Sequence, residues 1–105
     1  MEYNKQDFLE TAGPQTLKQI ARTRELTRKY NQIEHSDTEA RKALLRELFG
    51  AIGTNVEIDT PFYCDHGKNI FIGNDVIINI NCTFVDNRPI HIGNQVLIAS
   101  NVQIY

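Results

Sequence analysis

Aliphatic side chains in the second half of the chain recur at a fixed interval. The dipeptide Ile-Gly returns every 20 residues, at Ile52, Ile72 and Ile92. A valine lies four residues after each of these isoleucines, at Val56, Val76 and Val96. An isoleucine lies six residues after, at Ile58, Ile78 and Ile98, and another apolar residue lies twelve after, at Cys64, Phe84 and Ile104. A period of six fits neither the 3.6-residue repeat of a helix nor the alternation of a strand. It is typical of hexapeptide repeats, in which a short strand and a turn occur three times per triangular coil. The chain from about Ile52 onward therefore predicts a parallel β-helix.

Small and polar residues fall where this coil should turn a corner. Glycine follows each of the three isoleucines, and six asparagines lie in or near predicted corners: Asn74, Asn79, Asn81, Asn87, Asn94 and Asn101. Glycine and asparagine tolerate positive φ better than other residues, so we expect them to make the bends. An ordinary β-sandwich of short strands is the alternative, but sandwiches do not repeat at a fixed period with Ile-Gly in register.

Residues 1–50 follow a helical pattern instead. Gly13-Pro14 predicts a break and a helix start, because proline is tolerated at the first helical position. A helix over 14–31 follows, and a shorter helix over 6–11 precedes the break. The apolar stripe of the longer helix is irregular and consists of Leu17, Ile20, Ala21, Leu26 and Tyr30.

A second helix is indicated more clearly. Ser36 and Glu39 fit a capping box, with Ser36 as the N-cap. The apolar face of this helix has helical spacing and consists of Leu44, Leu45, Leu48, Phe49 and Ile52. Gly50 lies close to its expected end. We therefore divide the chain into a helical region, residues 1–50, and the first coils of a β-helix, residues 51–105.

Composition narrows the class of protein. The chain has 105 residues and a formal net charge of −2, which suits one small domain and gives no basic patch for nucleic acid. No apolar run is long enough to cross a bilayer, and the polar N-terminus lacks the apolar segment of a secretory signal. Cys64 and Cys82 are expected to be reduced, buried thiols. We expect a cytoplasmic protein.

Three blocks of sequence resemble the maltose and galactoside O-acetyltransferase family. They are Thr-Pro-Phe-Tyr-Cys-Asp-His-Gly-Lys-Asn-Ile from Thr60, Asn-Ile-Asn-Cys-Thr-Phe-Val-Asp from Asn79, and Ile-Gly-Asn-Gln-Val-Leu-Ile-Ala-Ser-Asn-Val-Gln-Ile-Tyr from Ile92. Segments 22–31 and 43–49 are similar to the family's N-terminal helical region. The resemblance implies a left-handed β-helix, a homotrimer, and acetyl transfer from acetyl-CoA to a hydroxyl of a sugar such as maltose, glucose or a galactoside.

The mechanism that the resemblance implies needs a histidine as general base, which removes the proton as the hydroxyl attacks the thioester carbonyl. That histidine is expected a few residues beyond Tyr105, and none of His35, His66 and His91 matches it. We therefore expect no catalytic residue within residues 1–105 and no activity from this chain alone. The alternative function is a non-catalytic hexapeptide module for oligomerisation or binding.

The resemblance also implies five substrate-binding residues. Asn79 would contact the acceptor and the acyl group, and Asp65 and Arg22 would contact the sugar. Asp86 and Asn87 match a pair of acids near the sugar, with Asn87 replacing the second acid. The alternatives are structural: a corner asparagine for Asn79, and turn chemistry for Asp65 and Asp86.

Three further expectations concern metal, charge and assembly. His66 and His91 are 25 residues apart rather than 20, so they would not share a column, and we expect no metal site. The basic side chains of the first long helix should form a solvated face; they are Lys18, Arg22, Arg24, Arg28 and Lys29. Because a coil cannot bury its own faces and fewer than three cycles are complete, we expect self-association to cover the last strands.

Overall fold

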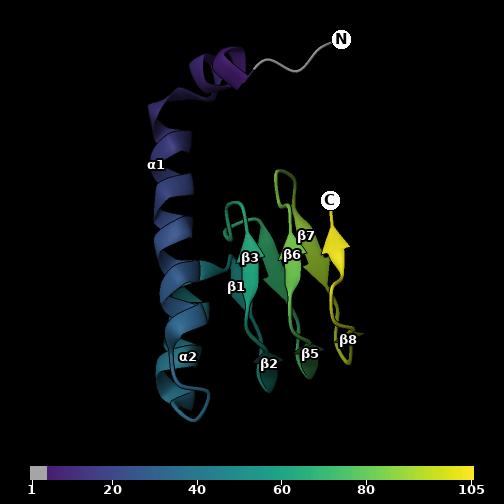
Figure 1. Ribbon diagram of the computed structural model, residues 1–105. Helices are drawn as coiled ribbons and strands as arrows, with labels where there is room; N and C mark the ends of the chain where they lie inside the picture. The colour runs from purple at the N-terminus through teal and green to yellow at the C-terminus, as the bar shows by residue number, and fades with distance from the viewer. Residues whose placement is uncertain (1–4) are drawn as a thin grey trace.

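Two helices are followed by nine short strands in the computed structural model, which describes residues 5–105 and, within them, side chains from Gly13 onward (Figure 1). The helices are α1 (Lys5–Gln32) and α2 (Thr38–Leu48). The strands are β1 (Ala51–Ile52), β2 (Val56–Ile58), β3 (Phe62–Cys64), β4 (Ile70–Ile72), β5 (Val76–Ile78), β6 (Cys82–Phe84), β7 (Ile90–Ile92), β8 (Leu97–Ile98) and β9 (Gln103–Ile104). The part of the predicted helical region at residues 1–4 lies outside the described residues.

The strands form three parallel sheets, one for each side of the coil. Their orders are β1-β4-β7, β2-β5-β8 and β3-β6-β9. The register advances by one 20-residue cycle at each step, so Ile58 lies beneath Ile78 and Ile78 beneath Ile98. These three side chains are 0%, 0% and 9% exposed, which confirms that they stack as an inner column. The parallel pairing excludes the β-sandwich alternative.

Aromatic and sulfur side chains fill the two inner columns at the third sheet. Phe62 pairs in register with Cys82, and Cys64 pairs with Phe84. The rings of Phe62 and Phe84 meet edge to face, with centroids 5.2 Å apart, a favourable aromatic geometry. Because the two cysteines lie in different columns, neither stacks on the other, and both are free and buried, as predicted.

The corners use positive φ at other positions than the predicted glycines. Within residues 5–105, positive φ outside glycine occurs at Asn55, Asp75, Asn81, Gln95 and Asn101. Gly53 and Gly73 do not adopt it, so the expectation that they supply positive φ is wrong. They are small for another reason: a Cβ on Gly73 would lie 2.9 Å from the carbonyl carbon of Gly93 and closer still to the Asn94 side chain. Close stacking of the coils therefore requires glycine here.

The asparagines beside these glycines link one coil to the next. The Asn74 side-chain oxygen accepts the backbone N–H of Thr54 at 2.8 Å, and that of Asn94 accepts the N–H of Asn74 at 2.8 Å. Asn81 and Asn101 adopt positive φ, as the sequence predicted. The corners are thus held by hydrogen bonds between residues one cycle apart.

Helix α1 is broken at Gly13, which has φ 79° and ψ 158°, so both the predicted break and the helices on either side of it are confirmed. The buried stripe differs from the predicted one. It consists of Thr23, Leu26, Thr27 and Tyr30, whereas Leu17 is 40% exposed and Ala21 is exposed. Thr23 and Thr27 can be buried because their hydroxyls donate to backbone carbonyls four residues earlier, at 2.9 and 3.0 Å.

Helix α2 begins one residue later than the capping box predicted. Asp37, not Ser36, is the N-cap, and its carboxylate accepts the N–H of Ala40 at 3.2 Å. Aspartate also neutralises the positive end of the helix dipole. The predicted apolar face is confirmed, with Leu45, Leu48 and Phe49 buried in the core.

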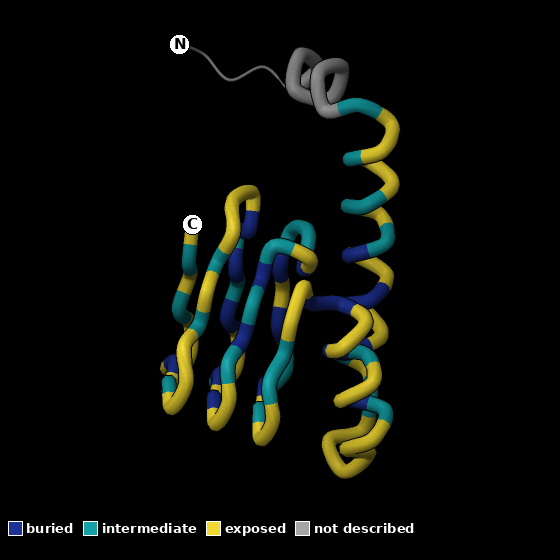
Figure 2. Tube along the Cα trace, turned by 180° about the vertical axis from the view of Figure 1, so that it is seen from behind, coloured by how far each residue is buried: buried dark blue, intermediate teal, exposed yellow. Residues whose placement is uncertain are grey.

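The two helices cover the first coil, and the opposite end of the β-helix leads to the C-terminus (Figures 1 and 2). Arg41 of α2 is only 6% exposed. Its guanidinium donates to the Ile58 carbonyl at 2.7 Å and to the Tyr30 hydroxyl at 3.1 Å. Burial raises the pKa of Tyr30, so its phenol stays protonated and donates to the same carbonyl. No helix among the described residues is long and apolar enough to cross a membrane.

Candidate functional site

A buried carboxylate organises the corner that follows β3 and β6. Asp86 is 0% exposed. One of its oxygens accepts the backbone N–H groups of Asp65, at 3.0 Å, and of His66, at 2.8 Å. Its own carbonyl accepts the side-chain amide of Asn69 at 2.8 Å. Charge-assisted hydrogen bonds of this kind are strong, so Asp86 fixes the segment that carries Asp65 one coil away.

Helix α1 contacts the same segment from outside. The Thr23 hydroxyl lies 2.8 Å from the His66 carbonyl, so its one proton is shared between that carbonyl and the one four residues earlier in the helix. Arg24 donates to the Cys64 carbonyl at 2.9 Å, and its guanidinium lies 3.5 Å from the Asp65 carboxylate. Arg24 is therefore not simply solvated, as the sequence predicted, because it joins α1 to the corner. No signal in the sequence marked this contact, because the burial of its neighbour Thr23 is seen only in the structure.

Arg22 faces a different neighbour. Its guanidinium donates to the Glu47 carbonyl at 2.7 Å, and Lys68 donates to the same carbonyl at 2.9 Å. These two cations stabilise the negative end of α2. With Lys18, Gln15 and Gln19 they also line a shallow pocket of about 410 Å³. The predicted sugar-binding arginine thus has a structural partner and also a surface open to solvent.

Asn79 lies apart from this corner, whereas Asn87 directly follows Asp86 in it. Asn79 precedes β6 and Asp86 follows it, so they are at opposite ends of that strand. Asn79 is half-buried, and its side-chain amide makes no hydrogen bond with any described residue. Asn87 is exposed and lines a separate pocket of about 280 Å³ that includes Tyr105. A single copy of the chain therefore brings Asp65, Asp86 and Asn87 to one corner, whereas Asn79 lies at the other end of β6 and Arg22 bonds to the end of α2.

The histidines and cysteines show no catalytic arrangement within residues 5–105. His91 is exposed and stacks on Phe71 with ring centroids 4.8 Å apart, pointing away from the core as alternation along the strand predicts. Burial raises the pKa of the Cys64 thiol far above its ordinary range, so the thiol stays protonated and is a poor nucleophile. No group of three or more potential metal ligands occurs among the described residues.

Comparison with known proteins identifies the family. Residues 2–53 match the family profile described as the maltose acetyltransferase hexapeptide capping motif. The galactoside O-acetyltransferase of Escherichia coli K12 is 37% identical over 83 residues, which is 79% of this chain and 41% of that protein. The chain belongs to the maltose and galactoside O-acetyltransferase family.

Two solved structures of hexapeptide-repeat acetyltransferases have the same fold. A maltose O-acetyltransferase from Clostridium difficile 630 superposes with a TM-score of 0.86 at 35% identity, over 89% of this chain and 50% of that one. An acetyltransferase from Vibrio cholerae O1 biovar eltor, complexed with acetyl coenzyme A, gives 0.82 at 37% identity, over 88% and 49%. This confirms the predicted left-handed β-helix. The chain spans about half the length of these acetyltransferases.

Proposed function

We propose that the protein takes part in acetyl transfer from acetyl-CoA to a sugar hydroxyl. The observation that carries the proposal is the continuous match to sugar O-acetyltransferases through both helices and the first coils. In this reaction the hydroxyl attacks the thioester carbonyl, a histidine acting as general base takes its proton, and CoA leaves as the thiolate, which that histidine then protonates. Maltose, glucose and galactosides are the acceptor class.

Within this chain, we assign the acceptor side of the site to five residues. The unpaired amide of Asn79 is available to donate to the acceptor or to the thioester carbonyl. Asp65 is partly exposed and held in place by Arg24, which suits a carboxylate that accepts from sugar hydroxyls. Asp86 is fully buried, so it acts as a positioning residue through Asp65. Arg22 and Asn87 would contact more distant parts of the sugar.

Asn79 and Asp86 lie at opposite ends of β6 within one copy, so the proposal includes a second copy. Sheet β2-β5-β8 carries outward apolar residues: Ile77 is 47% exposed and Leu97, its partner in register, is 67% exposed. Ile80, in the adjacent turn, is 50% exposed. An exposed apolar ladder on a small protein marks an interaction surface. A homotrimer would bury it and would bring Asn79, next to this sheet, toward another copy. This surface also favours the second candidate function, a non-catalytic oligomerisation module.

The test is an assay of CoA release with acetyl-CoA and maltose, glucose or a methyl galactoside. The 105-residue chain alone should release no CoA above background, because its general base is expected beyond Tyr105. A chimera that joins residues 1–105 to the remaining coils of the Clostridium difficile enzyme should be active. In that chimera, Asn79→Ala should lower kcat/KM at least tenfold, whereas Lys29→Ala, on the exposed side of α1, should not change it. A folded but inactive chimera would support the non-catalytic module.

A further inference from the structure

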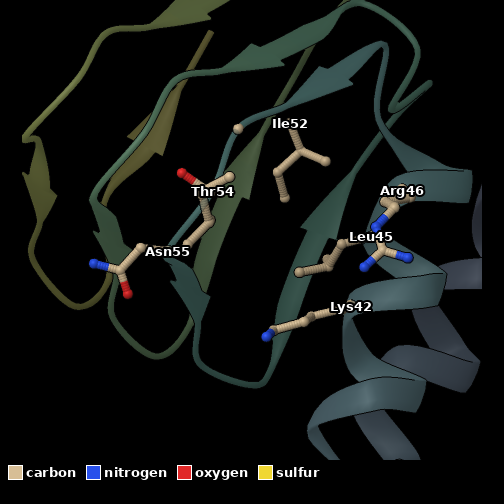
Figure 3. Close-up of a pocket in the computed structure, with 8 residues that line it drawn as sticks. Lys42, Leu45, Arg46, Ile52, Thr54 and Asn55 are labelled. Atoms are coloured by element: carbon tan, nitrogen blue, oxygen red, sulfur yellow. The ribbon is translucent and has the colours of Figure 1, made fainter.

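A pocket of about 340 Å³ lies between α2 and the first corner of the β-helix, away from the residues assigned to the acceptor. Its lining comes from α2, from β1 and from the turn that leads into β2, whereas Asp65 and Asp86 follow β3 and β6. Figure 3 shows Lys42 and Arg46 extending from the helix on one side of the pocket and Thr54 and Asn55 on the other. The volume is within the range of small-molecule sites.

The pocket combines an apolar floor with two cations. Leu45 is buried, and Ile52 and Val56 are half-buried. Lys42 and Arg46 are one helical turn apart on α2, so both side chains leave the same face of the helix. Neither makes an ion pair or a side-chain hydrogen bond with any described residue. No Asp or Glu is among the lining residues that the structure describes.

The pocket wall opposite α2, formed by Thr54 and Asn55, gives Lys42 and Arg46 no ion-pair partner. The Asn55 amide donates to the Asp75 carboxylate at 2.8 Å, and the Thr54 backbone N–H donates to Asn74 at 2.8 Å. Asp75, a carboxylate on the neighbouring coil, is therefore already hydrogen-bonded to Asn55. A guanidinium beside an ammonium is suited to an oxyanion, because the guanidinium can hold two oxygens at once.

We propose that this pocket binds a small amphipathic anion, in which a carboxylate or phosphate group meets Lys42 and Arg46 and a compact apolar body lies on Leu45, Ile52 and Val56. The inference does not depend on the proposed acetyl transfer, since it uses none of the residues assigned to that reaction. Carboxylate and phosphate share the chemistry that the cations recognise, and the experiment separates them.

The test is ligand-detected ¹⁹F NMR on the 105-residue chain with 4-fluorobenzoate and 4-fluorophenyl phosphate as probes. The chain should bind at least one of them, and the one that binds more tightly identifies the anion. The double variant Lys42→Gln with Arg46→Gln should bind that probe at least tenfold more weakly. Both side chains are exposed, so circular dichroism of this variant should match that of the unmodified chain.

A control variant and two control ligands make the result specific. Lys29→Gln with Arg88→Gln removes the same charge from exposed positions outside the pocket and should bind the probe as the unmodified chain does. Neutral 4-fluorobenzyl alcohol should bind at least tenfold more weakly, and inorganic phosphate at the probe's concentration should not displace it. Equal binding by the two double variants, equal binding of the alcohol, or displacement by phosphate alone would overturn the proposal.

Discussion

At the scale of single residues, the corner glycines are explained by the distance between coils. Gly73 lies directly against the Gly93 backbone and the Asn94 side chain. We therefore expect Gly73→Ala to lower the free energy of unfolding of the 105-residue chain by about 1–3 kcal/mol, the usual cost of overpacking. Urea denaturation followed by circular dichroism measures this.

Gly93→Ala is the matched control for that prediction. Gly93 occupies the same position of the repeat, but a Cβ built on it meets nothing within 4 Å. Its free energy of unfolding should change by less than about 0.5 kcal/mol, as is usual for a surface substitution. If both substitutions destabilise the chain equally, the glycines are needed for backbone conformation and not for close stacking.

The sequence predicted the place of a residue in the fold correctly where burial alone determines that place. The 20-residue recurrence of Ile58, Ile78 and Ile98 predicted a buried column, because every member of a column meets the same apolar surroundings. The same recurrence could not reveal the role of Asp86, since its partners are backbone N–H groups 20 and 21 residues earlier. Every residue except proline can supply a backbone N–H, so partners of this kind cannot be recognised from the sequence.

At the scale of elements, α2 is attached to the β-helix by a buried cation. Arg41 donates to the Ile58 carbonyl at the end of β2 and to Tyr30 of α1, so one side chain connects three elements. We expect Arg41→Met to lower the free energy of unfolding by about 1.5–3 kcal/mol, the range for hydrogen bonds from a charged group. Chemical denaturation measures the loss, with methionine retaining most of the buried volume.

The neighbouring residue provides the comparison for Arg41. Lys42→Met alters the same helix turn, but Lys42 is exposed, so its effect should stay within about 0.5 kcal/mol. Equal stability of the Arg41→Met chain and the unmodified chain would show that apolar packing replaces the cation at no cost, as occurs at some buried ion pairs.

The two helices differ in how well the sequence predicted which of their faces is buried. The face of α2 was predictable because Leu45, Leu48 and Phe49 are apolar and helically spaced. The buried face of α1 was not, because it contains Thr23 and Thr27, whose hydroxyls are satisfied within the helix. Arg24 was missed as a contact for the same reason, since it lies beside a polar residue that gave no sign of burial. Of the candidate site, the residues came from the family resemblance, and the contact between Asp65 and Asp86 was seen only in the structure.

At the scale of the whole molecule, the last coil has one neighbour. Within the described residues, β7, β8 and β9 each pair along one edge only. Unpaired strand edges and the outward side chains Ile77 and Leu97 both favour association. We expect the 105-residue chain to sediment as an oligomer, well above its monomer mass of 12.0 kDa, and to lose β-structure as dilution dissociates it.

The substitution Leu97→Lys tests whether the chain associates through the outward face of sheet β2-β5-β8 or through the unpaired edges of its last strands. Leu97 is 67% exposed in one copy, so a lysine there does not disturb the monomer but places a charge in any interface that covers this sheet. If sheet β2-β5-β8 is the interface, Leu97→Lys should raise the concentration at which the oligomer dissociates by at least about tenfold in sedimentation velocity. Tyr105→Lys changes a residue that is 85% exposed and lies beyond β9, and it should leave that concentration unchanged. Equal behaviour of the two variants would assign association to the strand edges, whereas a folded monomer at the lowest concentration would remove the need for association altogether.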